Sequence, residues 1–125
     1  MGKLMDFLLN NQVEDITEEI TLSERLKGFK FVIKAIPSAG YDDYIARARK
    51  DSSMKDRKAE TALILDYCVE PNFRDKEALK QSGCKTPYEL IDKTLKIGEQ
   101  KNLYLAISKL SGFESMEAQV ERVKN

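Results

Sequence analysis

The chain has 125 residues, of which 42% are hydrophobic and 34% charged, and its 21 basic and 21 acidic residues give a formal net charge of zero. This length suits one ordinary domain with its own core, residues 1–125, and the zero net charge argues against a general affinity for nucleic acid or acidic membranes. Histidine is absent, which removes the commonest general base and metal ligand, and two cysteines make no disulfide framework, so a reducing cytoplasm is the expected location.

Residues 1–12 form a predicted N-terminal arm. Only Asp6 interrupts the apolar residues from Leu4 to Leu9, and the segment is too short to form a stable helix by itself. We therefore expect the arm to dock on another surface. The chain's own core is the usual place for an apolar terminus, and a neighbouring subunit is the alternative. The candidate partner contacts in the arm are Leu4, Phe7 and Leu8.

An antiparallel β-hairpin is predicted from about Ile16 to Ile36. Its first strand has apolar residues on one face, namely Ile16, Ile20 and Leu22. Its second strand shows the best two-residue period in the chain, with Phe29, Phe31, Ile33 and Ala35 on one face. A lone hairpin is marginally stable in water, so helices or a third strand must cover its apolar face.

A helix is predicted after Pro37, with Ser38 as its N-cap, through about Lys50. Tyr41, Tyr44, Ile45 and Ala48 fall at i, i+3, i+4 and i+7. The two tyrosines could stack on nucleic-acid bases, although tyrosines on a helix face more often pack in the core with the hydroxyl reaching water. Tyr41 and Tyr44 are the remaining candidate partner contacts.

The segment 47–58 carries the largest local charge excess, with two acidic residues against six basic ones: Arg47, Arg49, Lys50, Lys55, Arg57 and Lys58. It could contact an acidic partner or nucleic acid, or it could be a solvated loop. No nucleic-acid-binding motif accompanies it, so we do not expect nucleic acid as a partner.

Residues 59–69 suit either a helix or a strand, and their length and alanines favour a helix that ends before Pro71. Asp75 is placed to cap a short helix through Lys80, which Gly83 would terminate.

A capping box is predicted at Thr86-Pro87-Tyr88-Glu89, in which Thr86 accepts a hydrogen bond from the third helical N–H and Glu89 reaches back to the Thr86 N–H. A buried stripe should follow, made by Tyr88, Leu90, Ile91, Thr94, Leu95 and Ile97. A second stripe of apolar residues consists of Leu103, Ala106, Ile107 and Leu110, and it ends at Gly112, which is suited to a left-handed cap.

The polar tail 114–125 has only a thin stripe of apolar residues, which predicts either a marginal helix or a frayed end.

No catalytic, metal or cofactor site is predicted. The serines have no histidine to activate them, the adjacent Asp42 and Asp43 would point about 100° apart on a helix, and no glycine-rich loop matches a phosphate-binding motif. No apolar run approaches the roughly 18 residues of a membrane span. We therefore expect a protein that is not an enzyme, needs no cofactor and contacts no membrane.

Four stretches carry a resemblance to a known family: LMDFLLNN at the start, VEPNFRDKEAL, GCKTPYELIDKTLKIGE and the closing LSGF. With them, nearly the whole chain resembles the XkdN-like phage tail assembly chaperones, which occur in tailed phages and defective prophages of Gram-positive bacteria. None of the four stretches is a catalytic motif.

The resemblance implies an α+β domain, with a small N-terminal antiparallel hairpin packed against a helical C-terminal part. It also implies a chaperone that binds the tape measure protein in the host cytoplasm during tail assembly and is absent from the finished virion. Other tail proteins and a second copy of the chain are further candidate partners. The alternatives are a structural tail component and a nucleic-acid-binding phage regulator that uses residues 47–58.

Overall fold

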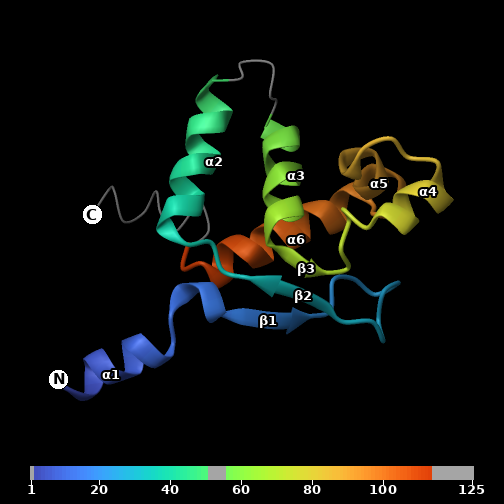
Figure 1. Ribbon diagram of the computed structural model, residues 1–125. Helices are drawn as coiled ribbons and strands as arrows, with labels where there is room; N and C mark the ends of the chain where they lie inside the picture. Colours follow the sequence, from blue (N-terminus) through green and yellow to red (C-terminus); the bar gives the residue numbers. More distant parts are fainter. Residues whose placement is uncertain (1, 51–55, 114–125) are drawn as a thin grey trace, which may run out of the picture.

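A three-stranded antiparallel sheet, in the order β1-β2-β3, has the helices that follow the hairpin on one side, whereas the N-terminal helix leads away from it (Figure 1). The computed structural model describes residues 2–50 and 56–113. Its elements begin with α1 (Lys3–Asn10) and the short 3-10 turn η1 (Val13–Asp15), and the helical part lies mostly after the hairpin. The expected α+β class is confirmed.

The predicted hairpin is present. β1 (Thr17–Ile20) pairs antiparallel with β2 (Phe31–Lys34), with Thr17 opposite Lys34 and Ile20 opposite Phe31. The alternation in β2 places Phe31 and Ile33 in the core, as expected. Phe29 was expected on the same face but is 66% exposed, because it follows the turn at Gly28, where φ is +98°, and precedes the first residue of the strand.

The ambiguous segment 59–69 contains both elements. It is helical through the end of α3 (Asp56–Tyr67) and then continues directly as β3 (Cys68–Glu70). β3 pairs with the other edge of β2, through Cys68 opposite Ile33 and Glu70 opposite Val32. The preference for a helix was therefore right for most of the segment and wrong for its last residues, which the β2 edge recruits.

The helix expected after Pro37 is α2 (Ser38–Lys50). The first intrahelical hydrogen bond runs from the Tyr41 N–H to the Pro37 carbonyl at 3.0 Å, so Pro37 occupies the capping position that was predicted for Ser38. α2 approaches α3 closely at Gly40. A Cβ atom there would lie 2.0 Å from Oη of the buried Tyr67, so the contact requires glycine.

The short helix α4 (Lys76–Ser82) has the predicted caps at both ends. Asp75 Oδ1 accepts a hydrogen bond from the Glu77 N–H at 3.0 Å. Gly83 adopts the left-handed conformation with φ at 74°, and its N–H donates to the Lys80 carbonyl at 3.3 Å.

The cap of α5 (Pro87–Thr94) differs from the prediction in one bond. Thr86 Oγ1 accepts from the Glu89 N–H at 3.2 Å, as expected. The Glu89 carboxylate, however, accepts from the Lys85 N–H at 2.8 Å and not from that of Thr86. The side chain reaches one residue further back, so the two bonds still fix the same first turn.

Replacing Thr86 by alanine should lower the free energy of unfolding by roughly 1 kcal/mol, because the Glu89 N–H loses its acceptor. We expect the double variant Thr86→Ala/Glu89→Ala to cost less than the sum of the two single variants, since both bonds order one turn. Chemical denaturation of the three variants measures this coupling. If the free-energy costs of the two single variants add up to the cost of the double variant, the two hydrogen bonds act independently.

The stripe predicted to run on to Ile97 is interrupted. Leu95 has extended backbone angles (φ −116°, ψ 138°) and is buried, whereas Ile97 is 53% exposed. The chain therefore changes direction at Leu95, between α5 and α6 (Ile97–Leu110). The buried Gln100 stabilises the break by donating through Nε2 to the Leu95 carbonyl at 3.2 Å.

α6 packs against α3 and the sheet, and it buries Leu103 and Ile107 completely, as the second stripe predicted. Gly112 is left-handed (φ 95°), and its N–H donates to the Lys109 carbonyl at 3.0 Å. The Phe113 N–H donates to the Ser108 carbonyl at 3.0 Å, which completes a Schellman cap. The side chains with less than 2% exposure define the centre of the core: Ile33, Ile64, Ile91, Leu103 and Ile107.

Candidate functional site

The N-terminal arm is a helix with an uncovered apolar surface. α1 has no buried residue, and Figure 1 shows it leading away from the rest of the chain. The exposed fractions of its apolar side chains are large: Leu4 72%, Met5 48%, Phe7 62%, Leu8 50% and Leu9 48%. We considered docking of the arm on the chain's own core the more usual arrangement, and that prediction is therefore wrong.

The arm is helical even though its length disfavours a lone helix. Three polar side chains at its C-terminal end donate hydrogen bonds to carbonyl groups of its last two turns, where most carbonyls have no intrahelical partner. Asn10 Nδ2 donates to the Asp6 carbonyl and Asn11 Nδ2 to the Phe7 carbonyl, each at 2.8 Å. Gln12 Nε2 donates to the Leu9 carbonyl at 3.2 Å. These bonds stabilise the C-terminal end of the helix from within its own segment.

The structure separates the two candidate tyrosines of α2. Tyr44 is half-buried and packs against the hydrophobic core, whereas Tyr41 is 38% exposed. The Tyr41 ring lies against the Phe113 ring, with centroids 5.3 Å apart and an interplanar angle of 37°. Tyr41 and Phe113 therefore form a small aromatic surface at the end of α6, to which Tyr44 does not contribute directly.

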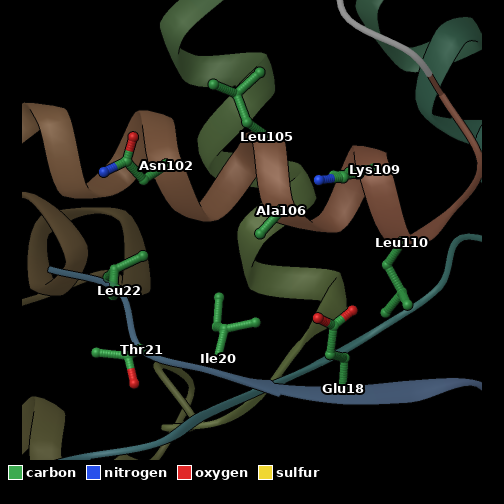
Figure 2. Close-up of a pocket in the computed structure, with 9 residues that line it drawn as sticks. All are labelled: Glu18, Ile20, Thr21, Leu22, Asn102, Leu105, Ala106, Lys109 and Leu110. Carbon is green, nitrogen blue, oxygen red and sulfur yellow. The ribbon is translucent and has the colours of Figure 1, made fainter.

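A groove between β1 and α6, called the β1–α6 groove below, was not predicted from the sequence. Its volume is about 640 Å³. Figure 2 shows the residues that line it: Glu18, Ile20, Thr21, Leu22, Asn102, Leu105, Ala106, Lys109 and Leu110. The sequence held one indication of this groove. Leu105 is an apolar residue outside the predicted buried stripe, and its side chain is 57% exposed.

A buried carboxylate ties the connection after β1 to the start of α6. Glu99 is 4% exposed and accepts hydrogen bonds from Ser23 Oγ at 2.5 Å, Arg25 Nη2 at 2.7 Å and the Lys96 N–H at 2.8 Å. The hydrogen bond from Arg25 is the main reason that the pKa of Glu99 falls from its ordinary 4.5 to about 2. Both oxygens of Glu99 accept hydrogen bonds from neighbouring groups of the fold, so we assign Glu99 a structural role.

The two cysteines are free thiols. Burial, with a smaller effect of the Glu70 charge, raises the pKa of Cys68 to about 12, which keeps this thiol protonated at neutral pH.

Within residues 2–50 and 56–113 no cluster of three or more cysteine, aspartate or glutamate side chains could hold a metal ion. The same residues include no helix long and apolar enough to cross a membrane.

Two features of the sequence fall wholly or partly outside the described residues. The structure does not describe residues 51–55 or the side chains of 47–50, 56 and 57, which carry most of the basic excess. The thin stripe of the tail 114–125 also lies outside them.

Comparison with known proteins gives one family and one fold relative. The sequence matches the profile of the phage XkdN-like tail assembly chaperone protein over residues 4–124. Among curated proteins, none matches the sequence significantly. The fold is similar to the crystal structure of the protein YqbN, with a TM-score of 0.65 and 19% identity over 91% of this chain and 99% of that one. The family match spans nearly the whole chain, α1 included, and this chain therefore belongs to the phage XkdN-like tail assembly chaperone family.

Proposed function

We propose that this chaperone binds the tape measure protein during tail assembly, in the cytoplasm of the bacterial host, and leaves before the virion is complete. One observation carries the proposal: the apolar side chains of α1 are 48–72% exposed, and none of them is buried by the other described residues. Leaving such a surface in water is unfavourable, so it marks an interaction site. The proposed role involves binding alone and no catalysis.

The proposed contact is between α1 and an apolar face of the partner. Leu4, Phe7 and Leu8 fall at i, i+3 and i+4, the spacing by which one helix packs along another. Tyr41 would extend the contact, since more than a third of its side chain is exposed beside Phe113. Tyr44 would act indirectly, by holding α2 against the core.

Replacing Phe7 and Leu8 by serine should weaken capture of the tape measure protein by about a hundredfold or more. Burying one such side chain contributes roughly 1.5–3 kcal/mol, and each 1.4 kcal/mol is about tenfold in affinity. Co-expression and co-purification of the two proteins, followed by titration, measure the change. The control is Val13→Ser, because Val13 is 46% exposed just beyond α1. Equal capture by both variants would rule out α1 as the contact.

A role as a permanent tail component is tested separately. The proposal predicts that mass spectrometry of purified tails finds the tape measure protein and lacks this chain. Finding this chain in the particle at a fixed ratio to the tail proteins would contradict the proposal.

A further inference from the structure

We propose that α1 of one copy docks into the β1–α6 groove of a second copy. This interaction goes beyond tape measure binding and requires no tape measure protein, although both proposals use the apolar face of α1. Three features of the chain match the arm to the groove: length, apolar surface and the placement of charges.

The first match is length. α1 has eight residues and is therefore ~12 Å long at about 1.5 Å per residue. The groove follows α6 from Asn102 to Leu110, which spans about the same distance. Its other wall, from Glu18 to Leu22, is an extended segment of roughly 13 Å. The arm and the groove therefore match in length.

The second match is apolar surface. The floor of the groove is formed by the half-buried side chains of Ile20, Ala106 and Leu110, with the exposed Leu105 above them (Figure 2). A helix laid along α6 would cover Leu105 and place Phe7 and Leu8 over this floor. Each copy thus covers apolar surface of the other that its own chain leaves in water.

The third match is charge. Glu18 and Lys109 lie toward one end of the groove, and the uncharged Asn102 and Thr21 lie toward the other (Figure 2). The charged residues of α1, Lys3 and Asp6, both fall in its N-terminal half. Lys3 and Asp6 are three residues apart and lie on the same flank of α1, so both face one wall of the groove. With their half of α1 at the Glu18 end, one ion pair forms at that wall: Lys3 with Glu18 or Asp6 with Lys109. Among the described residues, none of these four charges is paired within its own chain.

The connection to β1 holds the arm away from the groove of its own chain. The Asp15 N–H donates to the Gln12 carbonyl and the Ile16 N–H to that of Val13, each at 3.0 Å. The Ile16 carbonyl accepts from the Ala35 N–H at 3.0 Å, which fixes the end of this turn to the sheet. The groove that receives α1 therefore belongs to another copy. Each copy has one arm and one groove. In the proposed arrangement the two copies exchange arms reciprocally, which closes the pair as a two-fold dimer and leaves no free arm or groove for a third copy.

Sedimentation equilibrium over a range of concentrations tests the proposal. We expect the wild-type chain to reach twice the monomer mass, and the variants Phe7→Ser/Leu8→Ser and Leu105→Glu to stay monomeric. The matched control for the groove is Ile97→Glu, since Ile97 lies on the same helix, outside the groove, and is 53% exposed. A wild-type chain that is monomeric throughout, or equal effects of Leu105→Glu and Ile97→Glu, would overturn the proposal.

A mixing experiment separates exchange of arms from any other dimer. The Phe7→Ser/Leu8→Ser variant keeps an intact groove, and the Leu105→Glu variant keeps an intact arm. Mixed together, two chains that are each monomeric should form a heterodimer, weaker than the wild-type dimer because it has one docked arm. Failure to form a heterodimer would refute docking of α1 in the groove.

Tape measure capture by the Leu105→Glu variant distinguishes this inference from the proposed function. If both hold, a second copy and the tape measure protein compete for the apolar face of α1, and this competition, unlike the dimer, rests on the proposed function. With its arm released, this variant should capture the tape measure protein at least as well as the wild-type chain. A monomeric wild-type chain that captures the tape measure protein through α1 would overturn only the dimer. A dimer of exchanged arms that captures none would overturn only the proposed function.

Discussion

Replacing Ile107 by alanine should lower the free energy of unfolding by about 2–5 kcal/mol. Ile107 lies on α6 at the centre of the core, where its side chain is fully buried together with Leu103 and Ile64. Alanine would remove apolar contacts and leave a cavity that the packed helices can only partly fill. Leu95→Ala should have a cost in the same range, because Leu95 is 7% exposed.

Ile97→Ala is the control for this prediction, because it makes the same chemical change on the same helix at a side chain that is 53% exposed. Its expected cost is within about 0.5 kcal/mol, as is usual for surface substitutions. Chemical denaturation measures all three variants. An Ile107→Ala midpoint equal to that of Ile97→Ala would contradict the packing of α6 against α3 and the sheet.

Replacing Glu99 by alanine should cost about 3 kcal/mol at neutral pH, since hydrogen bonds to charged groups contribute about 1.5–3 kcal/mol each. The buried carboxylate holds Ser23 and Arg25 against the N-terminus of α6. Glu24→Ala is the matched control, because Glu24 is 91% exposed and its ion pair with Lys27 is long, at 3.9 Å. We expect no measurable effect of that control. Equal midpoints for the two variants would show that the Glu99 contacts do not stabilise the fold.

The contribution of Glu99 should also depend on pH. Its pKa is about 2 in the folded chain and 4.5 ordinarily, so the folded state favours the charged form. The resulting stabilisation is complete above about pH 4.5 and is lost as the pH falls toward 2. The difference in unfolding free energy between the wild type and Glu99→Gln should therefore shrink across this window. A difference that stays constant down to pH 2 would mean that the pKa of Glu99 is not lowered by folding.

The sequence by itself determined the features that depend on a few neighbouring residues. The caps at Asp75, Gly83, Thr86 and Gly112 are where the residue types place them, because a cap is made by hydrogen bonds within one turn. The hairpin was also predictable, because alternation along a strand directly reports which face is buried. The family resemblance likewise followed from the sequence, and its profile covers residues 4–124.

The tertiary structure decided everything that depends on residues far apart in the chain. Residues 68–70 are a strand because the free edge of β2 pairs with them, and their own sequence does not distinguish strand from helix. Glu99 is buried because Arg25, 74 positions away, neutralises it, and no local pattern reports such a pair. The β1–α6 groove exists only where two distant elements meet, and α1 is exposed because no element of residues 2–50 and 56–113 buries its side chains. Local hydrogen bonding can be predicted from neighbouring residues, whereas burial and exposure depend on how distant segments pack.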